Sequence, residues 1–330
     1  MILISVLAGC NLSALFFAIF INELGRILNR TGLGIDLQTI NIAALIFADD
    51  LVLIAKNKKS LKKLMLMTRK YFKSNKLEIS SSKSKIMTVD GSPTVLFPES
   101  DDLPAIELDT VCSYKYLGIP INNTPRAMFK DFNEHVKNKA KRYLTSVFSL
   151  TRSGPDRSKL AYTLWTSCAI PAILYGVEVM PLTESTISML EKCNNSVGKF
   201  ILQLPQSSSN VAVHLDAGLR PILSIIAEKV ISYARSVATK PSSYWAKMAF
   251  TYNLSQGNQS AYSRYLAKNM DKAKTSMQPP NQLKKGVTSA AFSSVMEMQK
   301  YTASSTFAMR PMTKKEEWFK IKPWVSDSPC

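Results

Sequence analysis

The sequence predicts an α+β fold in which short apolar strands come first and amphipathic helices follow. Residues 40–47 and 51–55 are two runs rich in Ile, Leu and Val, and together they predict a β-hairpin. From Pro125 onward, apolar residues recur every three or four positions, which is the spacing of helices packed on a core. Because 46% of the 330 residues are hydrophobic, the chain can bury a sizeable core, and global disorder is excluded.

The N-terminal 22 residues contain no charged side chain and are mostly apolar, so they are long enough to span a bilayer. No Lys or Arg precedes them, although a signal peptide needs a positive start. A membrane anchor and a buried helix are the two alternatives, and the helical spacing of the apolar residues favours the buried helix. The residues at this spacing are Leu12, Leu15, Phe16, Ile19 and Phe20.

Residues 58–73 predict an amphipathic helix with an apolar face, a lysine-rich face and Ser60 as a candidate cap. The predicted apolar face consists of Leu61, Leu64, Met65, Thr68 and Phe72. Short strands are expected next, separated by a proline-rich loop or linker. We place strands at 77–79 and 86–89, the loop at 92–103, and a strand pair or turn at 114–121.

The second half of the chain predicts helices. The first begins at Pro125, and its apolar positions are Phe129, Phe132, Val136, Ala140, Tyr143 and Val147. Apolar or amphipathic segments follow at 158–179, interrupted by Pro171, at 183–204, with Ser185 as a candidate cap, and at 221–239. Beyond Pro241 the chain becomes polar, and we expect only part of it to be ordered.

Two adjacent carboxylates, Asp49 and Asp50, separate the strands of the predicted hairpin. Side chains alternate along a strand, but both carboxylates could converge on a cation at a tight tip. Mg²⁺ is commonly held by one or two carboxylates plus substrate phosphates, as two-metal phosphoryl transfer requires. The alternative is a solvated acidic turn, since Asp favours turns.

The charge of the chain indicates a polyanionic partner. The formal net charge is +18, and the stretch from Lys56 to Lys85 holds eleven Lys or Arg and one acid, Glu78. Such a run suits a nucleic-acid backbone or an anionic membrane, while the alternative is an ordinary solvated helix face. Five cysteines without a C-x-x-C pair argue against a disulfide scaffold and a zinc site.

The order of these segments resembles the C-terminal part of the reverse transcriptase of non-LTR (LINE-type) retrotransposons. The similar segments are 6–13 (Val-Leu-Ala-Gly-Cys-Asn-Leu-Ser), 16–24, 47–50 (Phe-Ala-Asp-Asp), 77–85, 116–119 (Tyr-Leu-Gly-Ile), 171–178, 202–205 and 217–221. The resemblance extends from about residue 5 to about residue 240 and rests on the order of the motifs more than on any one of them.

This resemblance implies roles for particular residues. Asp49 and Asp50 would bind catalytic Mg²⁺, and Lys83 would lie near the nucleoside triphosphate. Gly9 would let the backbone approach the template–nucleotide pair, and Tyr116, Leu117 and Gly118 would hold the primer end. A basic helix would follow the backbone of the nucleic-acid duplex. That helix extends from Lys130 to Arg142, and its expected binding residues are Lys137, Lys141 and Arg142. The implied partners are an RNA template and a DNA primer.

The resemblance also implies a missing part. The family has a further metal-binding Asp on a strand upstream of Gly9, and residues 1–8 do not supply it. We therefore expect this chain to bind Mg²⁺ weakly or not at all, and to be inactive alone in two-metal nucleotidyl transfer. Without that strand, an apolar edge of the palm sheet would be exposed, and either a partner chain or the apolar N-terminal helix could cover it.

The resulting domain prediction has three parts: a partial reverse transcriptase palm at 1–110, a thumb and helical connector at 111–240, and a polar, partly ordered C-terminal tail at 241–330. A truncated, inactive reverse transcriptase is the first hypothesis. A non-catalytic RNA- or DNA-binding protein derived from the same segment is the second, and a membrane-anchored basic protein is the third. We expect an intracellular protein, nuclear or cytoplasmic, that is not secreted.

Overall fold

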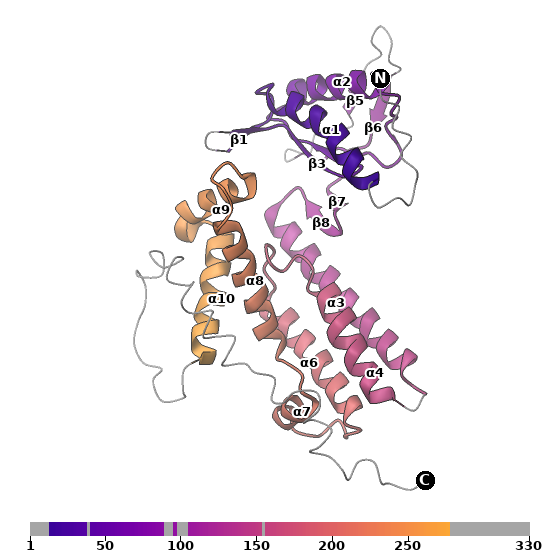
Figure 1. Cartoon of the computed structure of the whole chain (residues 1–330), viewed down its shortest axis with the longest axis vertical. Coiled ribbons are helices and arrows are strands. Elements are labelled where there is room, and N and C mark those ends of the chain that lie inside the picture. Colours follow the sequence, from indigo (N-terminus) through magenta and orange to yellow (C-terminus); the bar gives the residue numbers. More distant parts are fainter. Residues whose placement is uncertain (1–12, 38–39, 89–94, 98–104, 154–155, 278–330) are drawn as a thin grey trace. The chain divides into compact units, whose positions relative to one another are not determined.

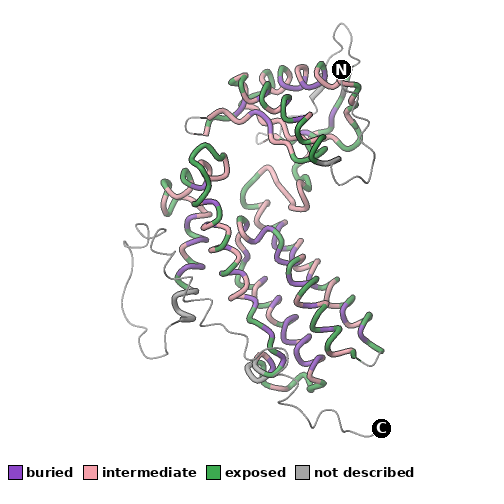
Figure 2. Tube along the Cα trace, in the orientation of Figure 1, coloured by how far each residue is buried: buried purple, intermediate pink, exposed green. Residues whose placement is uncertain are grey.

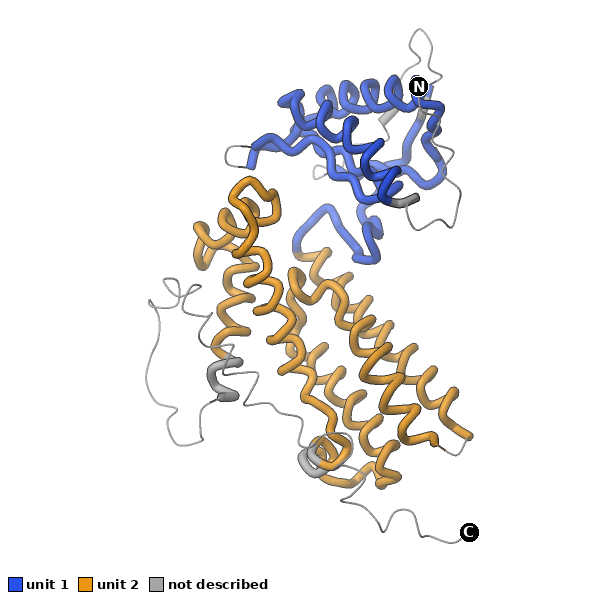
Figure 3. The backbone as a smooth tube through the Cα atoms, in the orientation of Figure 1, with its two compact units in different colours: residues 1–125 blue, residues 126–330 orange. Residues whose placement is uncertain are grey.

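A computed structural model of the chain describes residues 13–37, 40–88, 95–97, 105–153 and 156–277. The predicted α+β fold is confirmed, with small antiparallel sheets in the first part and helices in the second. The chain divides into two compact units, residues 1–125 and 126–330 (Figure 3). The boundaries of the three functional domains stay a prediction.

The described residues of unit 1 form two helices and four two-stranded antiparallel pairs (Figure 1). Its elements are α1 Ser13–Asn29, β1 Ile35–Leu37, β2 Ile40–Ile42, β3 Ala44–Phe47, β4 Asp50–Leu53, α2 Lys58–Ser74, β5 Val95–Phe97, β6 Ile106–Leu108, β7 Ser113–Tyr116 and β8 Ile119–Asn122. The pairs are β1–β2, β3–β4, β5–β6 and β7–β8. Leu24 and Leu28 of α1, Ala44 of β3 and Leu64 of α2 form the centre of one buried cluster. Both helices therefore pack against the β3–β4 hairpin.

The described part of the N-terminal apolar segment, residues 13–22, lies in helix α1, but the predicted buried face is wrong. Leu15, Phe16 and Ile19 are 55%, 42% and 63% exposed, whereas Leu24 and Leu28 are fully buried. The hairpin packs against the C-terminal half of α1, so the buried positions of this helix begin at Ile21. Leu12 lies outside the described residues. No helix among the described residues is long and apolar enough to cross a membrane.

The strands after α2 differ from the prediction. Residues 77–79 form no strand, and Ile86 makes only an isolated parallel bridge to Thr110. The expected loop at 92–103 contains strand β5, which pairs with β6. These pairings join residues that are distant in the sequence, and local apolar runs carry no record of their partners. The predicted strand pair at 114–121 is confirmed as β7–β8.

Two predicted helix caps are wrong by two or three positions. Asn57, rather than Ser60, caps α2, because its side chain accepts from the Ser60 backbone N–H at 2.8 Å. Thr183, rather than Ser185, caps α6 and accepts from the Thr186 N–H at 3.3 Å. In both helices, the side-chain oxygen of a residue before the predicted cap accepts from a backbone N–H group of the first turn. Each helix therefore begins before its predicted cap residue.

Unit 2 is helical among its described residues (Figure 1). Its elements are α3 Pro125–Leu150, α4 Arg157–Thr163, a π-helical turn Leu164–Ala169, α5 Ile170–Ile173, α6 Glu184–Ile201, α7 Asn210–Ala217, α8 Ile222–Ala238, α9 Trp245–Ser255, a 3₁₀ turn Gly257–Gln259 and α10 Ala261–Met277. Figure 2 shows buried positions alternating with exposed ones along these helices. On α3, Phe132, Val136, Ala140 and Val147 are buried, as the spacing predicts.

The predicted interruption at Pro171 takes a specific form. A π-helical turn precedes it, and the helix continues through Pro171 to Ile173. The wide turn accommodates a residue that lacks a backbone N–H. Nearby, Trp165 is buried and its indole Nε1 donates to Asn194 Oδ1 at 2.8 Å, which ties this helix to α6.

Candidate active site at the β3–β4 hairpin

The β3–β4 hairpin places the two predicted carboxylates at its tip. Phe47 pairs with Asp50, so Ala48 and Asp49 form a two-residue turn and Asp50 is the first residue of β4. Ala48 has a φ of 50°, a conformation that favours glycine. Both carboxylates are exposed.

The two faces of the hairpin differ. Residues opposite each other on paired strands share a face. Ile46 and its partner Leu51 pack against the buried cluster beneath α1 and α2. Side chains alternate along each strand, so Phe47 and Asp50 lie on the other face, away from both helices. Phe47 is 62% exposed there. Asp50 therefore faces outward from the core of unit 1.

Asn29, at the end of α1, anchors the base of this hairpin. Its side-chain oxygen accepts from the backbone N–H groups of Ala43 and Ala44 at 2.7 and 2.9 Å, and its amide donates to the Ala44 carbonyl at 3.1 Å. The Ala43 carbonyl accepts from Ile54 N–H at 2.8 Å. These contacts explain why the predicted strand at 40–47 is divided between β2 and β3.

Strand β7 brings a further predicted residue to the hairpin. The pKa of the Tyr116 phenol is raised, first because burial penalises the phenolate and second because the negative charge of Asp50 lies nearby. Tyr116 is followed by Leu117 and Gly118, with φ of 47° and 82°. Positive φ at both central residues is the mark of a tight hairpin turn that matches strand twist.

The segment that carries Lys83 is attached to the same strand. The Tyr114 hydroxyl donates to the Lys83 carbonyl at 3.1 Å, and Lys85 forms an ion pair with Asp109 at 2.7 Å. Tyr114 and Tyr116 are two residues apart on β7, so they share a face. Through these two tyrosines, β7 links the Lys83 backbone with the surroundings of Asp50, and the Lys83 side chain is exposed.

The carboxylates of Asp49 and Asp50 can supply some of the oxygen ligands that one Mg²⁺ ion needs. Carboxylate oxygens suit Mg²⁺, which commonly takes one or two of them together with substrate phosphates. Asp49 and Asp50 supply such oxygens. In the described parts of the chain, no group of three or more His, Cys, Asp or Glu side chains could hold a metal. Gly9 lies outside the described residues.

The predicted basic residues of α3 belong to unit 2 and differ in their surroundings. Lys141 and Arg142 are exposed. Lys137 is partly covered and forms an ion pair with Glu134 at 2.9 Å. This neighbour lowers the positive charge that Lys137 offers to a ligand. Lys141 and Arg142 are therefore the more available cations of the three.

The candidate site lies in a segment that is similar to a known protein family. Residues 5–121 match the reverse transcriptase (RNA-dependent DNA polymerase) family. The reverse-transcriptase-like segment ends within β8 and so includes the acidic hairpin, Lys83 and the turn at Leu117 and Gly118. No curated protein matches the chain. The match confirms the resemblance at the level of the reverse transcriptase, and the non-LTR subtype stays a prediction.

Sequence reasoning missed two residues that organise the site, Asn29 and Tyr114. A signal for Asn29 was present, because Asn near a helix end often bonds backbone groups. Tyr114 enters the prediction only as the first residue of the strand pair or turn at 114–121. Its hydrogen bond to Lys83, across 31 residues, has no local signature.

Proposed function

We propose that the chain is the palm and thumb part of a non-LTR retrotransposon reverse transcriptase, and that alone it binds primer and template without extending the primer. The observation that carries this proposal is the proximity of Asp50 to Tyr116 within a segment that matches the reverse transcriptase family. These two residues were assigned by resemblance to the metal site and to the primer grip.

Each residue has a distinct task in this proposal. Asp49 and Asp50 would hold Mg²⁺, which stabilises charge on the attacking and leaving oxygens of a phosphoryl transfer. Lys83, exposed and held through its backbone by Tyr114, would neutralise triphosphate charge. The β7–β8 turn would support the primer end, and Lys141 and Arg142 would contact phosphates, which position a duplex without reading its sequence.

The lack of catalysis follows from the donor count. Two-metal transfer needs carboxylates that fix both ions. Asp49 and Asp50 form a pair, and no third acidic, His or Cys ligand joins them among the residues that the structure describes. We infer that another carboxylate must be added, by another segment or by a partner chain, before the hairpin supports polymerisation.

A primer-extension experiment tests this proposal. A DNA primer annealed to an RNA template is incubated with Mg²⁺, the four deoxynucleoside triphosphates and the full chain, or its Asp49→Asn/Asp50→Asn variant. Binding of the same hybrid is measured in parallel over a range of salt concentrations. We expect no extension by either protein, and binding that weakens steeply with salt.

Two outcomes would contradict parts of the proposal. Extension by the wild type that disappears in the double variant would show that the chain is a complete catalyst, against our donor count. Failure of the wild type to bind the hybrid at low salt would remove the nucleic-acid function itself. A triple variant, Lys130→Gln/Lys141→Gln/Arg142→Gln, serves to locate the phosphate contacts on α3.

A further inference from the structure

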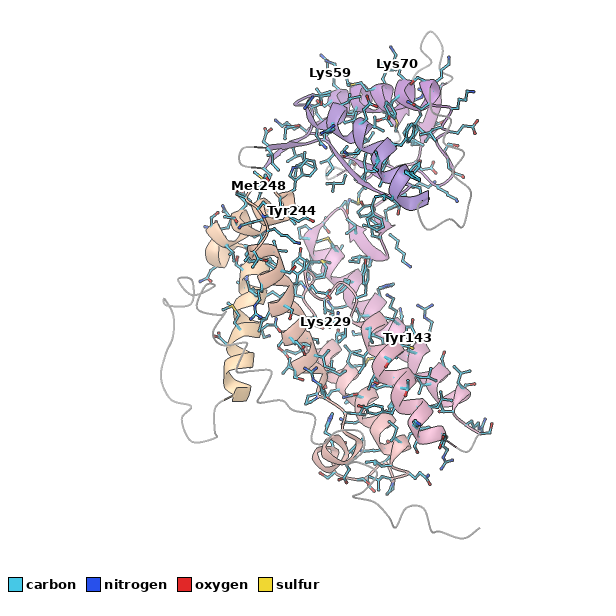
Figure 4. The ribbon with its side chains drawn as sticks, in the orientation of Figure 1. Lys59, Lys70, Tyr143, Lys229, Tyr244 and Met248 are labelled. Atoms are coloured by element: carbon cyan, nitrogen blue, oxygen red, sulfur yellow. The ribbon has the colours of Figure 1, made fainter. Side chains whose placement is uncertain are left out.

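The outer surface of α2 carries a lysine face, which we define as Lys58, Lys59, Lys62, Lys63, Lys70 and Lys73. At 3.6 residues per turn, these positions fall within an arc of about 140° around the helix axis. The helix contains no acidic residue. Figure 4 shows Lys59 and Lys70 projecting outward from α2. Within this arc Lys59, Lys63 and Lys70 are exposed and lie within about 40° of one another, while Leu66 and Arg69 occupy the gap between Lys63 and Lys70.

The lysine face is directed away from the acidic hairpin. On the opposite side of α2, Leu64, Met65 and Thr68 are buried, and Leu64 belongs to the cluster with α1 and β3. Asp50 lies on the hairpin face that points away from both helices. The core of unit 1 thus separates Asp50 from the lysines, so the lysine face is not a wall of the candidate active site.

The first two turns of the lysine face carry a cost to helix stability. Lys58 and Lys59 occupy the first turn, where the helix dipole disfavours cations. Lys59 and Lys63 are four residues apart, and like charges at that spacing repel. Among the described residues, Lys59, Lys63 and Lys70 form no ion pair. A polyanion would remove this repulsion on binding.

We propose that the lysine face of α2 is a second nucleic-acid contact that holds the phosphate backbone independently of the β3–β4 hairpin. From Lys59 to Lys73 the lysine face is about 21 Å long at 1.5 Å per residue. Phosphates along one strand recur about every 3.4 Å, so several of them fit along this face. The contact is electrostatic and independent of base sequence.

A nucleic acid suits the lysine face better than an anionic membrane. Amphipathic helices that lie on membranes insert an apolar face beside their basic residues. The apolar face of α2 is already buried in unit 1, with Leu64 fully covered and Met65 9% exposed. The exposed side chains of the lysine face are charged, and charge is what a phosphate backbone recognises.

The test uses the full chain with a triple variant, Lys59→Gln/Lys63→Gln/Lys70→Gln. Its matched control is Lys159→Gln/Lys192→Gln/Lys240→Gln, which removes the same charge from three exposed lysines of unit 2. Binding of a short DNA duplex is measured against salt concentration. We expect the slope of log K against log salt to become shallower by about 3 in the α2 variant, from about 0.9 per lost phosphate contact. The control should keep the wild-type slope.

A second readout tests the location directly. Acetylation of the lysines is followed by mass spectrometry, with and without duplex, in the wild type and in the Lys130→Gln/Lys141→Gln/Arg142→Gln variant of α3. We expect the duplex to protect Lys59, Lys63 and Lys70 in both proteins, because the contact on α2 does not depend on α3. Circular dichroism of the α2 triple variant should show an unchanged or higher melting temperature, since repulsion is removed.

Three results would overturn this inference. The first is an equal change of slope in the α2 variant and its control, which would reflect total charge. The second is protection of the α2 lysines that disappears in the α3 variant. The third is binding to vesicles of phosphatidylcholine and phosphatidylserine that the α2 variant loses while its duplex binding is unchanged. In each case hybrid binding by the wild type would leave the proposed function standing.

Discussion

The carboxylate of Asp50 lies within electrostatic range of the Tyr116 phenol, although 66 residues separate them in the sequence. One residue begins β4 and the other ends β7. Unit 1 therefore brings the acidic hairpin and the predicted primer grip into one neighbourhood.

This proximity predicts a change in the titration of Tyr116. Replacing Asp50 with Asn should lower the pKa of Tyr116, because a negative neighbour that opposes the phenolate is removed. The pKa should stay above 10.0, its ordinary value, since burial is the larger cause. NMR titration of the tyrosine ring carbons measures the shift. Asp49→Asn is the matched control, and an equal effect of both substitutions would argue against a specific pairing.

The same shift predicts loss of stability in alkali. A group whose pKa is raised by folding contributes stability below its unfolded pKa and loses it as the pH rises through the folded value. The pKa values of Tyr116 and Tyr71 are both raised, and burial is the larger cause for each. Urea unfolding of the chain should therefore require less denaturant above pH 10 than below it. Constant midpoints across this range would contradict the partial burial of these two phenols.

Removing the side chain of Asn29 should loosen the hairpin. In Asn29→Ala, the backbone N–H groups of Ala43 and Ala44 lose their acceptor, which should cost about 2 to 3 kcal/mol in the free energy of unfolding. Asn22→Ala, an exposed position of the same helix, should change it by less than about 0.5 kcal/mol. Urea denaturation measures both. Equal stability of the two variants would show that Asn29 does not support β3.

Two adjacent asparagines of unit 2, Asn194 and Asn195, allow the effect of buried hydrogen bonds on stability to be compared. Asn194 is fully buried, accepts from Trp165 at 2.8 Å and donates to the Arg220 carbonyl at 3.0 Å. The side-chain oxygen of Asn195 is buried and has no hydrogen-bond partner among the described residues. Asn194→Ala should destabilise the chain by about 2 to 3 kcal/mol, and Asn195→Ala by about 1 kcal/mol or less. Thermal unfolding ranks them, and the reverse order would refute the network.

The β7–β8 turn should respond to residues that accept positive φ. Leu117 has a φ of 47°, and Asn tolerates this conformation better than Leu. Leu117→Asn should stabilise the chain by about 0.5 to 1 kcal/mol. Gly118→Ala, at a φ of 82°, should destabilise it by about 1 kcal/mol. Opposite signs in denaturant titrations are the expected result, and stabilisation by Gly118→Ala would contradict the turn.

Strong local patterns predicted much of this fold. The apolar periodicity of their own residues predicted two hairpins and four helices, namely β3–β4, β7–β8, α2, α3, α6 and α8. The predicted buried face of α1 was wrong because its N-terminal half is as apolar as its buried half. Composition cannot tell which side another element will cover.

The site was predictable in part for the same reason. The Asp-Asp pair and the Tyr-Leu-Gly turn are contiguous motifs, and both lie within the segment that matches the reverse transcriptase family. The contacts that hold them together are tertiary. Asn29 reaches the backbone of β3 and Tyr114 reaches Lys83, and no local pattern marks either partner.

Cation binding at the hairpin tip tests the central claim most directly. Mn²⁺ is added in place of Mg²⁺, and paramagnetic broadening of backbone amide signals is followed by NMR, with and without a deoxynucleoside triphosphate. We predict broadening centred on Asp49 and Asp50 that reaches Tyr116, strengthens with the triphosphate and disappears in Asp49→Asn/Asp50→Asn. Broadening that persists in this variant, or that centres on another part of the chain, would contradict the account.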